Sequence, residues 1–294
     1  MLDMAPLSFG TFWYGGRLSA LEKACAYSLI RQGCELTLYS YRRVDNIPDG
    51  VVLADASEII PEEMTKYFIF NNMPDLGHFS DFFRYSMFRK NKKTWVDLDM
   101  LFLSEPYVSP SGDIVVQERQ GSVNGAILGL TSPFLVDELI ARSKALMGKK
   151  LRWGETGPLL LEAVLGENND IAKMSSEIYY PIDHLDIYKI FLPEEKEWCM
   201  DQTSQSVALH LFNNILNKIG YWKDISPPEE SYLYGILKKI EAIDFFQGIY
   251  PDYVMKNIID NYNFRLNGKD LGLKNIIKQV VPSVYRSYRH YRPS

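Results

Sequence analysis

Residues 78–103 read HFSDFFRYSMFRKNKKTWVDLDMLFL, and this stretch decides the fold. Its first half repeats apolar residues with helical spacing and places Asp81 and Arg84 three positions apart on one polar face. We therefore predict a helix of about three turns that ends in the basic run 89–93. An aspartate and an arginine with this spacing can also form a surface ion pair worth about 0–1 kcal/mol, so alone they indicate no function.

The second half of the stretch predicts a short buried strand, Thr94-Trp95-Val96, that runs directly into Asp97-Leu98-Asp99. Both carboxylates then lie at the carboxyl end of a strand, where open α/β sheets bind ligands. Two acids one residue apart among apolar neighbours need a counter-charge. A divalent cation supplies it, and hard oxygen ligands favour Mg²⁺ or Mn²⁺, which complete their shells with water and substrate phosphate. A bare Asp-x-Asp, however, is most often only a turn after a strand.

The two halves together resemble a known family. The run Ser80-Asp81-Phe82-Phe83-Arg84-Tyr85, the linker 86–94 and then Trp95-Val96-Asp97-Leu98-Asp99 are similar to the DXD-containing sugar transferases of glycosyltransferase family 32, with the clostridial glucosylating toxins as distant relatives. The family usually has Gly-Gly and an aromatic residue before the strand, whereas this chain has Asn91-Lys92-Lys93-Thr94-Trp95. The resemblance implies a GT-A fold, a nucleotide-sugar donor, a Mn²⁺ or Mg²⁺ ion and retention of anomeric configuration.

The N-terminal part predicts the opening of an α/β nucleotide-binding fold. Ser19 and Glu22 form the sequence signature of a helix start, and Gly33 predicts the end of that helix. The predicted elements are a strand at 7–14, a helix at 18–32 and strands at 35–41 and 51–55. The fold class that we expect is α/β, with a GT-A type, Rossmann-like sheet and a small C-terminal helical appendage.

Trp13, Tyr14 and Gly15 follow the first predicted strand. They match the position at which the family receives the nucleotide base, so the resemblance implies an aromatic ring stacked on uracil and a glycine that lets the backbone come close. Trp13 and Tyr14 can equally be core aromatics. By the same resemblance, Asp81 would bind sugar hydroxyls, and Arg84 would contact the donor sugar or its phosphates, a task that suits the planar guanidinium.

Three further candidates lie downstream. Asn124 lies in a glycine-containing strand predicted at 122–130, and the family places an asparagine near here. Thr156-Gly157-Pro158 predicts a helix start and resembles an acceptor-side segment of the family, which makes Glu155 the carboxylate expected nearest the reaction centre. His210 ends a predicted last strand, and the family closes its metal site with a similarly placed histidine. A lone histidine in an apolar run is nevertheless more often a core residue.

Composition predicts a cytoplasmic enzyme. The chain has 294 residues, of which 46% are hydrophobic and 23% charged, enough for one large domain or for one domain with an appendage. It shows neither the sequence signs of a signal peptide nor an apolar run that could span a membrane. The three scattered cysteines indicate reduced thiols, and a net charge of -5 argues against nucleic-acid binding.

We expect a catalytic domain over residues 1–215 and a C-terminal helical region over 216–294. The end of that region is basic, and tyrosines alternate with its arginines. Such a tail can lie on an anionic membrane surface, where lipid-linked glycan acceptors are found, which would make the protein peripheral on the inner face of the membrane. A solvated, disordered tail explains the same composition equally well.

The sequence therefore predicts a retaining glycosyltransferase that moves a hexose or N-acetylhexosamine from a nucleotide sugar, expected to be UDP-linked, to a polysaccharide or lipid-linked oligosaccharide. Asp97, Asp99 and His210 would hold the metal. Two alternatives stay open. One is a haloacid-dehalogenase-type phosphatase, whose Asp-x-Asp motif normally lies on the first strand of the chain. The other is a non-catalytic sugar-nucleotide-binding protein, which would show no transfer or hydrolysis.

Overall fold

A six-stranded sheet forms the centre of the fold in a computed structural model that describes residues 7–166 and 171–267. In chain order its strands are β1 (Ser8–Phe12), β2 (Glu35–Ser40), β3 (Val51–Asp55), β6 (Thr94–Val96), β8 (Ile114–Gln117) and β9 (Val123–Gly129). They lie in the order β3-β2-β1-β6-β9-β8, parallel from β3 to β6 and antiparallel where β9 meets β6 and β8. The predicted α/β class with a mostly parallel central sheet is confirmed.

Two small sheets lie beside the central one. β4 (Ile69–Phe70), β5 (Met73–Pro74) and β10 (Lys150–Leu151) form the first. In the second, β7 (Met100–Phe102) pairs antiparallel with β11 (Ala208–His210), and Met100 lies opposite His210. Because β7 begins directly after Asp99, this pairing brings a histidine from far along the chain to the carboxyl end of β6.

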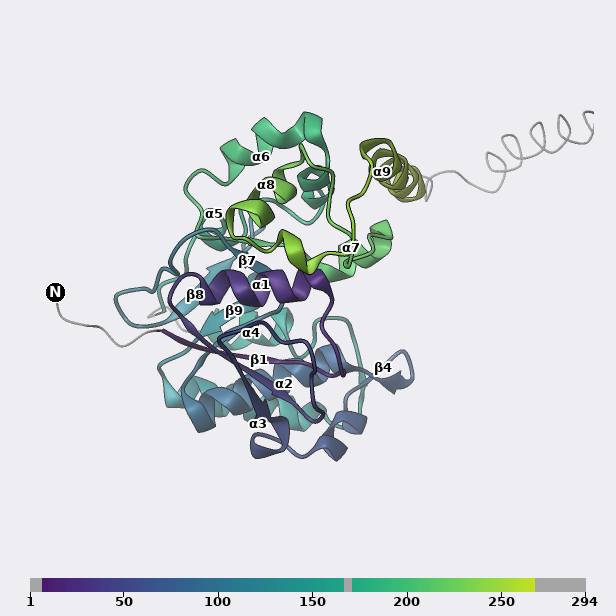
Figure 1. Cartoon of the computed structure of the whole chain (residues 1–294). Coiled ribbons are helices and arrows are strands. Elements are labelled where there is room, and N and C mark those ends of the chain that lie inside the picture. Colours follow the sequence, from purple (N-terminus) through teal and green to yellow (C-terminus); the bar gives the residue numbers. More distant parts are fainter. Residues whose placement is uncertain (1–6, 167–170, 268–294) are drawn as a thin grey trace, which may run out of the picture.

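Helices cover both faces of the central sheet (Figure 1). Trp95 packs in the core cluster of α2, α3 and α4, whereas its neighbour Val96 packs in the cluster beneath α1, because successive residues of a strand point to opposite faces. The helices are α1 (Ala20–Ile30), α2 (Leu76–Asn91), α3 (Pro133–Leu146), α4 (Pro158–Leu165), α5 (Ser176–Tyr179), α6 (Lys196–Gln202), α7 (Asn213–Ile219), α8 (Tyr232–Lys239) and α9 (Asp252–Asn267). Short 3₁₀ turns span Ala56–Glu58, Glu62–Tyr67, Ile187–Phe191, Pro193–Glu195 and Ile243–Phe245.

α6 and the helices after β11 pack on the outer side of α1, and Figure 1 shows α6 and α8 beyond it. Leu21 and Cys25 of α1 belong to the same hydrophobic cluster as buried residues between positions 182 and 262. The boundary predicted after residue 215 lies inside α7. The division into two domains stays a prediction, although residues on both sides of that position share one core.

Residues close in sequence determine where the first two helices begin and end. The capping box of Ser19 and Glu22 is present at the start of α1, and Gly33 follows the helix with φ 76°. α2 is longer than the three turns predicted, with 16 residues. Asp75 caps its N-terminus ahead of the apolar stripe, and it ends where Lys92 adopts a left-handed conformation at φ 54°.

The described residues 7–166 and 171–267 contain no helix that is both long and apolar enough to cross a membrane. The basic C-terminal tail, for which we predict membrane contact, lies outside the described residues.

The cap of α2 generates a prediction about stability and pH. His78 Nδ1 lies 2.6 Å from Asp75 Oδ1, and His78 Nε2 lies 2.9 Å from the Arg152 carbonyl oxygen. Burial by itself would lower the pKa of His78, but the hydrogen bonds to Asp75 and Arg152 outweigh it and raise the pKa. The pKa of Asp75 is lowered, chiefly by its hydrogen bond to His78. The pair therefore stabilises the fold most when the histidine is protonated and the carboxylate is ionised.

We expect His78→Gln to lose about 1–2 kcal/mol of unfolding free energy near pH 5. A histidine whose pKa is raised by folding adds stability that is fully present below the pKa of the unfolded chain, about 6.5. This stability disappears as pH rises through the folded pKa. The difference in unfolding free energy between the variant and wild type should therefore shrink toward pH 8.5. Below about pH 4, the pKa of an aspartate in the unfolded chain, the difference should shrink as well, and it disappears as pH falls through the lowered folded pKa of Asp75. Urea unfolding from pH 3 to 8.5 measures both changes. A stability difference between His78→Gln and wild type that does not change with pH would contradict the assignment. So would a pH-dependent difference of the same size when both proteins also carry Asp75→Asn.

Candidate functional site

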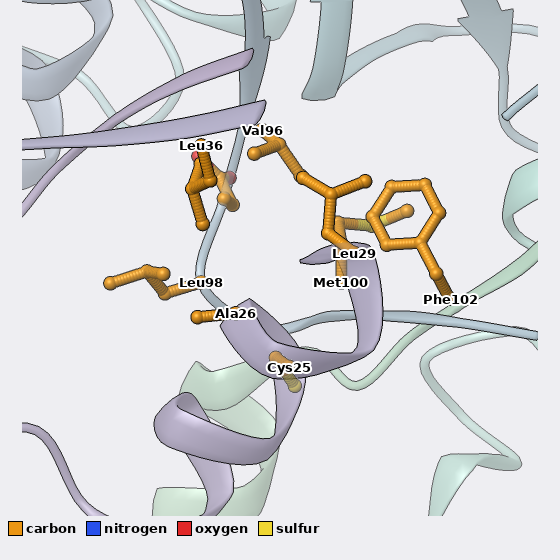
Figure 2. A pocket seen from close by; sticks show the side chains of 9 residues that line it. Cys25, Ala26, Leu29, Leu36, Val96, Leu98, Met100 and Phe102 are labelled. Atoms are coloured by element: carbon orange, nitrogen blue, oxygen red, sulfur yellow. The ribbon is translucent and has the colours of Figure 1, made fainter. Parts of the chain in front are cut away.

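The turn Asp97-Leu98-Asp99 joins β6 to β7 and is held from behind by apolar packing. Asp97 N donates to the Ala126 carbonyl oxygen at 2.7 Å, and Met100 N donates to the Asp97 carbonyl oxygen at 3.1 Å. Figure 2 shows Leu98 of the turn together with the apolar side chains of β6, β7, α1 and β2 that gather behind it, namely Cys25, Ala26, Leu29, Leu36, Val96, Met100 and Phe102. Hydrogen bonds and packing together fix the backbone that carries the two carboxylates.

Arg84 connects α2 to this turn. Its Nη2 lies 3.4 Å from Asp97 Oδ1 and 3.4 Å from Asp81 Oδ1, and its guanidinium lies 4.8 Å from the centre of the Trp95 ring. Trp95 Nε1 donates to Asp97 Oδ1 at 2.6 Å. Arg84 is only 5% exposed, and its Nε has no hydrogen-bond partner within the described part of the chain. The structure thus brings Asp81, Arg84 and Asp97 together and places Trp95 beside them.

Burial and charge shift the two carboxylates next to Arg84. Burial raises the pKa of Asp97 to about 6, and the charge of Asp99 adds to this increase while Arg84 opposes it. Burial also raises the pKa of Asp81. Thr156 Oγ1 donates to Asp81 Oδ2 at 2.9 Å, so this carboxylate has a fixed orientation.

Two glycines make room for these charged side chains. A Cβ atom at Gly125 would lie 1.8 Å from Arg84 Nη1, and one at Gly157 would lie 2.7 Å from Asp81 Oδ2. The sequence indicated that glycines in the strand around residue 125 let a ligand approach. In the structure it is the Arg84 guanidinium that approaches Gly125.

Asp99 and His210 form the second part of the site. His210 Nε2 lies 3.4 Å from Asp99 Oδ2, while Leu211 N donates to the Asp99 carbonyl oxygen at 2.9 Å and Asn213 N donates to Asp99 Oδ2 at 2.8 Å. Asp99 is 8% exposed and His210 7%. Burial would raise the pKa of Asp99, but His210 outweighs it and the pKa is lowered. His210 Nδ1 is buried and has no hydrogen-bond partner in the described residues.

These residues fit a divalent cation whose shell the substrate would complete. Among residues 7–166 and 171–267, no group of three or more histidine, cysteine, aspartate or glutamate side chains converges as a ready metal site. Asp99 and His210 offer one carboxylate and one imidazole, whereas Asp97 Oδ1 is already bonded to Trp95. Mg²⁺ commonly binds to one or two carboxylates and takes its remaining ligands from water and substrate phosphates, and Mn²⁺ also suits these donors.

Glu118 is a site residue that the sequence did not reveal. Asn124 Nδ2 donates to Glu118 Oε1 at 2.6 Å, and Ala126 N donates to Asn124 Oδ1 at 2.7 Å, so the predicted Asn124 is held between a carboxylate and the strand that supports Asp97. The negative charge of Glu118 contributes to the raised pKa of His210, after the larger effects of burial, which lowers it, and of Asp99. Glu118 lies in the loop after β8, where no motif marks it.

Glu155 lies in the loop before α4 and bonds within that loop. Arg152 N donates to Glu155 Oε2 at 2.8 Å, and Arg152 Nη2 lies 3.4 Å from Glu155 Oε1. Its neighbour Thr156 reaches Asp81, and Tyr85 Oη donates to the Thr156 carbonyl oxygen at 2.8 Å. The loop is therefore tied to the site through Thr156 rather than through Glu155.

Trp13, Tyr14 and Gly15 follow β1 at its carboxyl end, and Tyr14 is 36% exposed. Trp13 is partly buried, and its Nε1 donates to the Arg17 carbonyl oxygen at 3.2 Å. Tyr14 Oη donates to Glu62 Oε1 at 2.7 Å. Gly15 faces the Trp13 ring, since a Cβ there would lie 3.0 Å from Trp13 Nε1. The two aromatic residues are thus not fully buried core residues.

Comparison with known proteins finds loose structural likeness alone. No family model and no curated protein matches the chain. A solved structure described as PaToxG glycosyltransferase aligns with 56% of this chain and 70% of its own, at 13% identity and a TM-score of 0.40. The apo structure of WbbM, a bifunctional glycosyltransferase, aligns with 84% of this chain and 52% of its own, at 10% identity and a TM-score of 0.45, so this chain spans about half of WbbM. Structural similarity this low supports no conclusion about function.

The packing of Gly125 against Arg84 generates a prediction. Gly125→Ala should displace the buried Arg84 guanidinium and break its ion pairs with the partly buried Asp81 and Asp97, at a cost of about 3–5 kcal/mol of unfolding free energy. Gly235→Ala is the matched control, because a Cβ there meets nothing within 4 Å and alanine favours the helix that contains it. Thermal unfolding of both variants compares them. Equal stability of Gly125→Ala and wild type would contradict the described packing.

Proposed function

We propose that the chain is a metal-dependent, retaining glycosyltransferase that moves a hexose or N-acetylhexosamine from a UDP-linked sugar to a polysaccharide or lipid-linked oligosaccharide. The observation that carries the proposal is the position of Asp99 beside His210 at the carboxyl end of β6, in the same turn as Asp97, which pairs with the buried Arg84. An oxygen and a nitrogen donor next to a guanidinium suit a cation and the diphosphate that it would bind. The ligand-binding edge of an α/β sheet is the expected place for them.

Asp99 and His210 would hold Mn²⁺ or Mg²⁺. Such an ion would supply Lewis-acid stabilisation of the charge that develops on the departing nucleotide. The surrounding carboxylates support a cation in this place, since Asp81, Asp97 and Glu118 add negative charge around Asp99 that Arg84 and His210 offset only in part.

Arg84 would orient the donor. Its guanidinium is held by Asp81, Asp97 and the Trp95 ring, so it is placed before substrate arrives, and a planar fork binds phosphate oxygens in a defined geometry. Asp81 is fixed by Thr156 and would accept hydrogen bonds from sugar hydroxyls. In this proposal Asp97 mainly holds Arg84 in place. Its carboxylate, two residues before Asp99, can also contribute to metal binding.

Residues around these groups would complete donor and acceptor binding. Trp13, Tyr14 and Gly15 would receive the uracil ring, which their partial exposure supports. Asn124, fixed by Glu118, would contact the donor, and Glu155 would face the acceptor side from the loop before α4. A retaining reaction does not require Glu155 to act as a nucleophile.

The proposal predicts that Asp99→Ala and Asp97→Ala each abolish sugar transfer. With Mn²⁺ present throughout, UDP at about 100 times its dissociation constant should raise the unfolding free energy of wild type by about 2.7 kcal/mol, and Asp99→Ala should lose this gain. Asp137→Asn is the matched control, because Asp137 pairs with Arg89 on the exposed surface of α2 and α3. Transfer assays with a panel of UDP-sugars and thermal unfolding with and without Mn²⁺ give the two readouts.

Near-normal transfer by both alanine variants would refute this mechanism. Phosphatase activity on a simple phosphoester that disappears in Asp97→Asn would favour the haloacid-dehalogenase alternative instead. Nucleotide binding without transfer or hydrolysis would favour a binding protein.

We also propose that residues 280–294 bind an anionic membrane surface on the cytoplasmic side, where lipid-linked acceptors are found. The alternation of arginine and tyrosine in this tail supports the proposal. Deleting 280–294 should release the protein from vesicles that contain anionic lipid in a sedimentation assay, while neutral vesicles should bind neither form. Unchanged sedimentation with anionic vesicles would refute it.

A further inference from the structure

A continuous chain of hydrogen bonds links Asp99 to the N-terminus of α1. Asn213 N donates to Asp99 Oδ2 at 2.8 Å, and Asn213 Nδ2 donates to Glu22 Oε1 at 3.3 Å. Lys223 Nζ donates to the same oxygen of Glu22 at 2.5 Å. A lysine and a glutamate that lie 201 positions apart therefore meet two bonds away from the candidate metal ligand.

The charge on Glu22 is not needed for capping α1. Its Oε2 accepts from Ser19 N at 3.0 Å and from Ser19 Oγ, which completes the capping box. A glutamine would serve this purpose as well. Glu22 is nevertheless an ionisable residue that is only 2% exposed, and its partner Lys223 has a side chain that is 18% exposed. Burying an ion pair costs desolvation energy, so its presence here calls for a role beyond the cap.

The backbone around Lys223 is fixed to the same helix end. Leu21 N donates to the Lys223 carbonyl oxygen at 3.1 Å, and Ala20 N donates to Asp224 Oδ1 at 2.8 Å. At the other end of the segment, Leu211 N donates to the Asp99 carbonyl oxygen. The segment 211–224 is thus anchored both at Asp99 and at α1, and the Glu22–Lys223 pair lies where it meets the helix.

We infer that Glu22 and Lys223 are positioning residues of the metal site. Their ion pair holds Asn213, whose backbone N–H in turn keeps the Asp99 carboxylate turned toward His210. The inference rests on the proposed function, in which Asp99 and His210 bind the cation, and it adds the residues that orient the first of them.

The test is the affinity for Mn²⁺ in the presence of UDP, read directly from the electron paramagnetic resonance signal of free Mn²⁺. Positioning predicts that Glu22→Gln and Lys223→Met both weaken binding, by about tenfold, as loss of outer-shell partners does. A purely electrostatic influence predicts opposite signs, because losing Glu22 removes negative charge near the cation while losing Lys223 removes positive charge. Lys223→Arg keeps the positive charge and should bind Mn²⁺ with wild-type affinity. Lys256→Met, which breaks an exposed pair with Glu194, is the control and should bind as wild type does.

The double variant Glu22→Gln with Lys223→Met keeps the net charge and leaves no unpaired buried ion, so it serves even if Lys223→Met alone fails to fold. About tenfold weaker binding by a folded double variant supports the inference. Wild-type affinity in Glu22→Gln and in the double variant overturns it, as do opposite shifts in the two single variants. Absence of Mn²⁺ binding by the wild type contradicts the proposed function itself, and the positioning role falls with it.

Discussion

The antiparallel pairing of β7 with β11 is the constraint on which the candidate site depends. Asp99 directly precedes β7, and His210 lies opposite Met100, so this register alone brings the imidazole to the carboxylate. A slip of one residue would turn His210 to the other face of the strand. The strands are short, and the hydrophobic cluster that joins Leu101 and Leu209 to α1 and to the C-terminal helices stabilises the register. The helices after β11 therefore contribute to the site through packing.

Charge balance is the second organising feature. Arg84 is buried between Asp81 and Asp97, and Asp99 faces His210, so each of these three acids has a basic partner close by. Burial still raises the pKa of Asp97, which indicates that these partners do not compensate fully. A protein that keeps acids in this state bears an electrostatic cost that an added cation would relieve. Gly125 and Gly157, which lack a Cβ, leave the space that the Arg84 and Asp81 side chains occupy.

Local sequence patterns predicted much of this arrangement. The capping residues of α1, the apolar stripe of α2 and the strand before Asp97 depend on neighbours in the chain, and His210 was correctly expected to end a strand. Contacts between distant positions escaped prediction. The periodicity of α1 says nothing of the bond between Glu22 and Lys223, the loop that holds Glu118 carries no motif, and Glu155 bonds to Arg152 because of a loop conformation that its sequence does not specify.

The most direct test is the position of a bound cation. Crystals grown with Mn²⁺ and UDP should show an anomalous-scattering peak at about 2.0–2.2 Å from a carboxylate oxygen of Asp99 and from a ring nitrogen of His210, with the diphosphate on the same ion. The absence of a peak there, with the nucleotide bound elsewhere on the protein, would contradict the assignment of this turn as a metal and diphosphate site.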